Sequence, residues 1–200
     1  MGPVRQSSLR LRRDSFDEQR LKKSVDPNAP LRIKILSLGS QFVGKSCVIK
    51  RFCEGRFVTK YISTVGVDYG VKPVQIENKT VRVNFWDLSG RPEFLEIRNE
   101  FFQDTQGVVL VYDVSERSTF DDLNKWLDEA ARFGLKGDLP VVLCANKIDK
   151  VRRVSEEEGR AFADSKGFAY FEASAASGAN ISDMFHLLFR HALKHADNRF

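Results

Sequence analysis

A glycine-rich segment early in the chain has the composition of a phosphate-binding loop. Residues 39–46 read Gly-Ser-Gln-Phe-Val-Gly-Lys-Ser and lie between an apolar run and an amphipathic stretch. Between a strand and a helix, such a loop wraps its backbone amides around a phosphate, and Lys45 neutralises charge on the terminal phosphates. Ser46 offers its hydroxyl to Mg²⁺. The segment predicts a nucleoside triphosphate site and leaves the base open.

A second motif indicates the base. Asn146, Lys147 and Asp149 follow the apolar run at 141–145, where a ligand crevice opens at the carboxyl ends of parallel strands. Guanine presents two N–H donors that one carboxylate accepts as a pair, whereas adenine would leave the Asp149 carboxylate without partners. The methylenes of Lys147 can lie along the plane of the base. Together with the phosphate loop, this motif favours a guanine nucleotide.

Two further places are candidates for contacts with the base. Ser174 and Ala175 follow the next apolar run, so their backbone N–H groups can donate to the guanine oxygen. Phe57 has two interpretations: its ring rests edge-on against the base, or it packs within its own loop.

Apolar runs that alternate with amphipathic stretches predict an α/β fold with a doubly wound sheet and right-handed crossovers. The near-continuous apolar runs indicate parallel strands buried on both faces, and the alternation around residues 77–79 indicates an antiparallel hairpin. One helix is expected through Phe120 and Trp126 with Ser118 as its cap, and another begins at a capping box on Ser155. The expected strands span residues 31–38, 67–76, 80–87, 107–112, 141–145 and 168–173.

Composition places the chain among ordinary globular proteins, with 42% hydrophobic and 30% charged residues. The net charge is +5. Residues 1–30 hold seven Lys/Arg and four Asp/Glu and so contribute +3, which leaves +2 for the remainder. We therefore expect a basic extension over 1–30, flexible in preference to a short helix that docks on the main domain, and no nucleic-acid partner. The main domain is expected at 31–195, with a short tail at 196–200.

Cysteine usage and the chain ends bear on location. Cys47, Cys53 and Cys144 lack metal-ligand spacing, so reduced thiols in the cytoplasm are expected. No apolar run reaches the ~18 residues of a membrane helix. Gln6 breaks the myristoylation pattern, and no cysteine follows Cys144. We expect no lipid anchor.

These motifs resemble the Ras superfamily of small GTPases over about residues 31–195, and its Rab branch most. Residues 61–69, Tyr-Ile-Ser-Thr-Val-Gly-Val-Asp-Tyr, look like a Rab switch I, and Trp86-Asp87 lead into switch II. The stretches 98–107 and 165–168, with the missing switch II glutamine, look like the RJL family, Rab-like proteins often fused to a C-terminal J domain. The chain has no His-Pro-Asp triplet, so a short form without the J domain is expected.

The resemblance implies a P-loop small GTPase fold: a six-stranded, mostly parallel sheet with one antiparallel hairpin strand and about five flanking helices. Its cofactors are GTP or GDP and Mg²⁺, with Ser46, Thr64 and Asp87 at the metal. The N–H of Gly90 should reach the γ-phosphate. Ala176 stands where a lysine is common. The expected nucleotide contacts are Gln41, Phe42, Val43, Gly44, Lys45, Ser46, Cys47, Phe57, Tyr61, Thr64, Gly90, Asn146, Lys147, Asp149, Ser174, Ala175 and Ala176.

Hydrolysis is expected to be slow. The candidate catalytic residues are Arg91, Gly90, Thr64 and Gln41, and the usual glutamine is absent from this set. Arg91 replaces the glutamine that orients the attacking water, and an arginine side chain only donates hydrogen bonds. Gln41 projects toward the space that an incoming arginine finger needs, and Pro92 restricts the backbone of Arg91.

Other readings stay open. Arg91 could act as a built-in cation or Gln41 as a displaced water-orienting group, a partner could complete catalysis in a normally cycling GTPase, or the chain could be a nucleotide-independent scaffold. The resemblance implies a monomer that binds effectors through switch I (about 57–68) and switch II (about 88–103), an exchange factor, and a basal-body, flagellar or nuclear association.

Overall fold

The computed structural model describes residues 31–60, 62–135 and 137–197. Six strands form one sheet in the order β2-β3-β1-β4-β5-β6, and β2 with β3 is the antiparallel pair. The predicted α/β class and the mostly parallel sheet are confirmed. The strands are β1 (Leu31–Leu38), β2 (Val67–Ile76), β3 (Lys79–Leu88), β4 (Gly107–Asp113), β5 (Val141–Asn146) and β6 (Ala169–Glu172).

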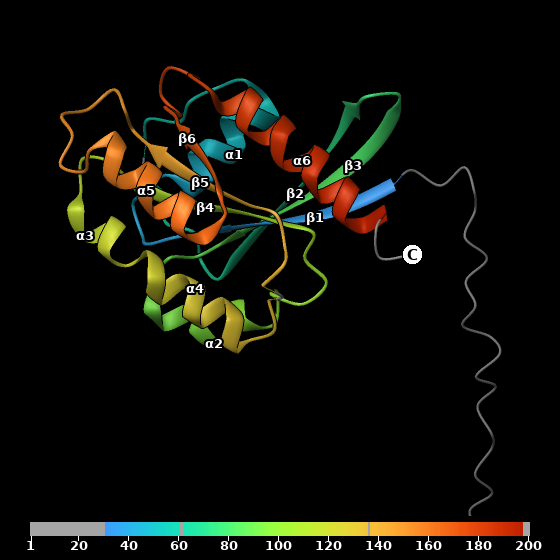
Figure 1. The fold of residues 1–200 in the computed structure, drawn as a ribbon, viewed down its shortest axis with the longest axis horizontal. Coiled ribbons are helices and arrows are strands. Elements are labelled where there is room, and N and C mark those ends of the chain that lie inside the picture. Colours follow the sequence, from blue (N-terminus) through green and yellow to red (C-terminus); the bar gives the residue numbers. More distant parts are fainter. Residues whose placement is uncertain (1–30, 61, 136, 198–200) are drawn as a thin grey trace, which may run out of the picture.

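Helices cover both faces of the sheet (Figure 1). Six α-helical segments occur in the described part of the chain, and α3 and α4 are separated by Asp122 alone, which agrees with the predicted number of about five. A 3₁₀ turn, η2, precedes α2. The helical segments are α1 (Lys45–Glu54), η2 (Pro92–Phe94), α2 (Leu95–Asn99), α3 (Arg117–Asp121), α4 (Leu123–Arg132), α5 (Glu156–Lys166) and α6 (Ile181–Asp197).

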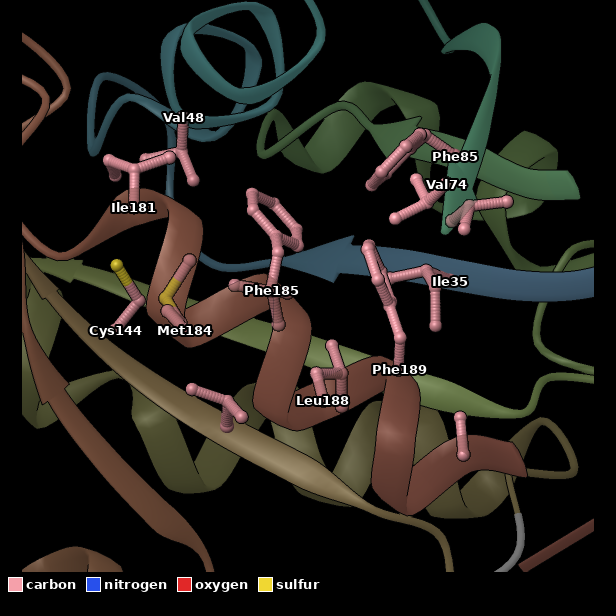
Figure 2. Close-up of a cluster of buried hydrophobic side chains, with 14 of the residues drawn as sticks. Ile35, Val48, Val74, Phe85, Cys144, Ile181, Met184, Phe185, Leu188 and Phe189 are labelled. Atoms are coloured by element: carbon pink, nitrogen blue, oxygen red, sulfur yellow. The ribbon is translucent and has the colours of Figure 1, made fainter. Parts of the chain in front are cut away.

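One half of the core lies between the sheet and helices α1 and α6. Residues spaced three and four apart along α6 face inward, and Figure 2 shows Phe185, Leu188 and Phe189 directed at Ile35 and Phe85 of the sheet. Full burial stabilises each such side chain by about 1.5–3 kcal/mol. A second cluster, which includes side chains of α4 and α5, fills the opposite face. The sheet is therefore anchored from both sides.

The strand ends differ slightly from the prediction. β4 and β5 each run one residue further, to Asp113 and Asn146, which brings both polar side chains to the carboxyl edge of the sheet. Phe168 is not in β6, because its N–H donates to the Ala163 carbonyl oxygen and closes α5 beyond the left-handed Gly167. The capping box at Ser155 is confirmed.

The single helix predicted with Ser118 as its cap is wrong. Two helices form instead, and the extended residue before the first is Glu116. At Asp122 the backbone N–H reaches the carbonyl oxygens of Ser118 and Phe120, so the turn tightens between the helices. The Asp122 carboxylate accepts a hydrogen bond from Ser40 Oγ at 3.3 Å, a tertiary contact that local sequence does not reveal.

β2 is an edge strand, and it contains Pro73 in its interior, paired with Arg82 of β3. The other edge, β6, has four residues. None of the helices in the described residues has both the length and the apolar character needed to span a bilayer.

Candidate nucleotide-binding site

A cavity of about 410 Å³ opens at the carboxyl edge of the sheet. Its walls come from the loop between β1 and α1, the start of α1, residues 57–60 and 62–64, residues 89–91, and the segments after β5 and β6. The expected contacts fall there, with three exceptions. Val43 and Ser174 are buried behind the wall, and Tyr61 lies outside the described residues.

The phosphate loop has a backbone shape that glycine permits. Gly39 has φ 135°, and a Cβ there would lie 2.1 Å from the Val111 carbonyl oxygen. Lys45 is buried, and its Nζ donates to the carbonyl oxygens of Gly39 at 2.6 Å and Ser40 at 2.9 Å. Burial lowers the pKa of this ammonium to about 8, although the nearby Asp87 carboxylate opposes the shift. The loop thus surrounds the ammonium group of Lys45.

The three expected metal ligands converge. Ser46 Oγ donates to Asp87 Oδ2 at 2.5 Å and lies 3.0 Å from Thr64 Oγ1. Ser37 Oγ donates to the other Asp87 oxygen at 2.6 Å, and burial raises the pKa of this carboxyl group. Two hydroxyls and one carboxylate are hard oxygen donors of the kind that Mg²⁺ takes alongside phosphate oxygens and water. These residues fit a magnesium ion.

Asn146 ties the walls of the cavity together. Its side chain is buried, donates from Nδ2 to the Val43 carbonyl oxygen at 2.8 Å, and accepts from the Ala175 N–H at 3.1 Å. Asn146 therefore fixes the phosphate loop relative to the loop after β6. Asp149 is exposed beside it, and its Oδ1 accepts from Ser174 Oγ at 2.5 Å.

The N–H groups expected at the guanine oxygen have other acceptors in this structure. The Ser174 N–H donates to the Ala179 carbonyl oxygen, while the Ala175 N–H bonds Asn146. The loop closes on itself, because Gly178 and Ser177 also donate to Ser174. Ser174 thus supports the wall instead of facing the cavity.

Asp113 is a site residue that the sequence analysis missed. Its Oδ2 lies 2.5 Å from Lys147 Nζ, which also donates to the Phe42 carbonyl oxygen at 2.6 Å. Burial would raise the pKa of Asp113, but hydrogen bonds from Lys147 and Ser115 outweigh it and hold the pKa below its usual range. The lysine stem is thereby stretched along the cavity rim. The sequence feature that could have indicated Asp113 is its position as a carboxylate at the end of a buried strand.

Additional cavity-lining residues also escaped prediction. They share no motif, and the three lysines among them add positive charge around a site expected to hold phosphates: Lys50, Val58, Thr59, Lys60, Ile62, Ser63, Ser89 and Lys150.

The expected catalytic residues all line the cavity. Gly90 packs so closely on the phosphate loop that a Cβ would lie 2.4 Å from the Gln41 nitrogen. Gln41 and Arg91 both line the cavity. Arg91 has an extended backbone before Pro92, as predicted, and its Nη2 pairs with Glu93 Oε1 at 2.6 Å, with both side chains about half exposed.

Comparison with known proteins defines the class. The family model described as the Ras family matches residues 34–194. The chain belongs to the Ras family of small GTPases, whose members bind GTP or GDP, generally with Mg²⁺.

Three similar relatives have closely matching names. DnaJ homolog subfamily C member 27 of Mus musculus and of Homo sapiens are each 49% identical over 178 residues, which cover 86% of this chain and 65% of the relative. DnaJ homolog subfamily C member 27-A of Xenopus laevis is 49% identical over 187 residues, 90% of this chain and 68% of the relative. The chain thus spans about 65% of the length of the two mammalian relatives. The predicted resemblance to Rab-like RJL proteins is confirmed.

Proposed function

We propose that this protein is a signalling or trafficking switch that binds GTP with Mg²⁺ and hydrolyses it slowly. The observation that supports slow hydrolysis is the position of Arg91, whose side chain pairs with Glu93 and supplies no hydrogen-bond acceptor to an attacking water. The rest of the cavity is suited to holding the nucleotide.

Binding would use the residues already assembled in the walls. Lys45 would donate to the terminal phosphates, Ser46 and Thr64 would bind Mg²⁺, and Asp87 would orient that shell. The ion would neutralise charge between the β- and γ-phosphates. Asp149 would accept the paired guanine donors in exchange for its bond with Ser174.

Hydrolysis requires an oriented water molecule and stabilisation of developing charge. Arg91 only donates, and its ion pair with Glu93 draws its guanidinium to a half-exposed neighbour. Gln41 is an exposed residue of the cavity lining, and its side chain would add bulk where an arginine finger from a partner would enter. Such a finger contributes about 10³–10⁵ in rate, so its exclusion would prolong the GTP-bound state.

Effectors would dock on an apolar surface beside the cavity. Ile62 is 69% exposed and Val65 is 75% exposed, and Leu95 and Ile97 of α2 are exposed too. An apolar surface of this kind is typical of partner docking. Phe94, which lies between Arg91 and α2, is only partly exposed.

Nucleotide content and single-turnover hydrolysis test the proposal. The purified full chain is denatured, and the released nucleotide is identified by chromatography. We expect GTP to predominate, and we expect GTP loaded with Mg²⁺ to persist for hours. Lys45→Ala serves as the control that loses nucleotide. Phosphate release within minutes, by the protein alone, would refute slow hydrolysis.

A normally cycling GTPase is the second candidate, because the Gln41 carboxamide also lines the cavity. A carboxamide both donates and accepts, which is the property needed to orient water. In that case Gln41→Ala would abolish rapid hydrolysis, whereas in the proposed slow enzyme it would change little.

A further inference from the structure

Arg98 of α2 is a buried arginine whose three side-chain nitrogens all have hydrogen-bond acceptors. Its Nε donates to Glu129 Oε1 at 2.5 Å and its Nη2 donates to Glu129 Oε2 at 2.7 Å. The Arg98 side chain is 4% exposed. Figure 1 shows α2 beside α4, which contains Glu129. A two-pronged arginine–carboxylate pair fixes orientation as well as distance, so it holds α2 on α4.

The same guanidinium group holds the backbone on both sides of Gly90. Arg98 Nη1 donates to the Arg91 carbonyl oxygen at 2.7 Å and lies 3.5 Å from that of Ser89. The guanidinium carbon also lies 4.8 Å from the ring centre of Trp126. Arg98 thereby connects the 89–91 segment to two side chains of α4.

Trp126 continues this network to the phosphate loop. Its Nε1 donates to Ser40 Oγ at 3.1 Å, and Ser40 Oγ donates in turn to Asp122 Oδ2. Gly90 packs against the backbone of Ser40 and Gln41. Gly90 is therefore confined between the phosphate loop and a backbone that Arg98 holds in place.

We propose that Arg98 is a positioning residue that fixes Ser89–Arg91 against the phosphate loop, so that this segment keeps one conformation with GDP or with GTP. The inference rests on the proposed nucleotide binding. The bonds of Arg98 to Glu129 and to the Arg91 carbonyl oxygen, here called the anchor, need no ligand. Breaking the bond to Glu129 would leave a buried charge without its partner. The γ-phosphate is not needed to order the segment.

Sensing of the γ-phosphate then falls on residues 57–66. Among the described residues, the Thr64 side chain has one hydrogen-bond partner, the Ser46 hydroxyl. Thr64 is partly exposed, and its neighbours Ile62 and Val65 are highly exposed. Among the described residues, 62–65 have fewer side-chain hydrogen bonds than 89–98, so a bound phosphate changes them more.

Hydrogen–deuterium exchange on the full chain tests this division. The protein is loaded with Mg²⁺ and either GDP or a non-hydrolysable GTP analogue. Exchange rates of peptides covering 88–98 should differ by less than about twofold between the two states, while those covering 57–66 should slow about tenfold with the analogue. Glu129→Gln should accelerate exchange at 88–98 about tenfold with GDP, and the analogue should restore protection.

The control is Glu158→Gln, which removes an exposed ion pair with Arg117 and should leave residues 88–98 unchanged. If Glu129→Gln does not fold, Arg98→Lys keeps the charge, loses the two-pronged geometry and is expected to behave the same way. A variant that is merely less stable would exchange faster with GDP and with the analogue alike, whereas loss of the anchor should be offset by the analogue.

Two results would overturn the inference: wild-type 88–98 slowing as much as 57–66, or a folded anchor variant exchanging like wild type. Rapid GTP hydrolysis would refute the slow-hydrolysis proposal alone, because the exchange comparison uses an analogue. Equal exchange at 57–66 in both states would count against nucleotide sensing itself, and the inference would fall with it.

Discussion

An Asn146→Ala substitution is expected to destabilise the fold as well as the site. Asn146 is 1% exposed. Without its side chain, the Val43 carbonyl oxygen and the Ala175 N–H lose buried hydrogen bonds of 2.8 and 3.1 Å. Each buried polar group left without a partner costs about 1–3 kcal/mol, so the free energy of unfolding should fall by about 2–6 kcal/mol. This is a large part of the about 5–15 kcal/mol that stabilises a typical domain.

The measurement is urea unfolding followed by circular dichroism, without nucleotide, so that altered ligand affinity does not contribute. Asn124→Ala is the matched control, because Asn124 is exposed on α4. A value for Asn146→Ala within about 0.5 kcal/mol of this control would contradict the structural role, since surface substitutions have effects of that size.

The remaining predictions concern nucleotide chemistry. Arg91→Gln should raise the single-turnover hydrolysis rate, because it restores a side chain that donates and accepts. No gain would place the main obstacle at Gln41 or Phe42. Gly90→Ala should weaken GTP-analogue binding at least about tenfold, or about 1.4 kcal/mol, in a titration, because the added methyl meets loop backbone. Unchanged affinity would show that Gly90 can move away. Cys47 lines the cavity, so bound GDP should slow its alkylation. The modification is measured by mass spectrometry, in alkaline buffer because burial raises the pKa of this thiol. Equal slowing at Cys53 would argue against a local effect.

Much of the fold could be predicted because its signals are local. The apolar runs of β4 and β5 were identified nearly to the residue, since both faces of each strand are buried. The break at Asp122 was missed because it accompanies a bond to Ser40, 82 residues away.

The candidate site divides in the same way. In the phosphate loop and the Asn146–Asp149 motif, local backbone geometry places the side chains, so the residue spacing indicated which of them line the cavity. The pairs Lys147–Asp113 and Arg98–Glu129 depend on which strands and helices become neighbours. Local spacing does not specify such pairs. Nor does it show that the backbone N–H groups of Ser174 and Ala175 already donate to other acceptors within the protein.

The two ends of the sheet have a consequence for self-association. An open strand edge offers unused N–H and C=O groups on which a second chain can assemble. Pro73 removes one such donor from the middle of β2, and β6 exposes a row only four residues long. Within the described residues, neither edge strand is therefore a good template for fibril growth.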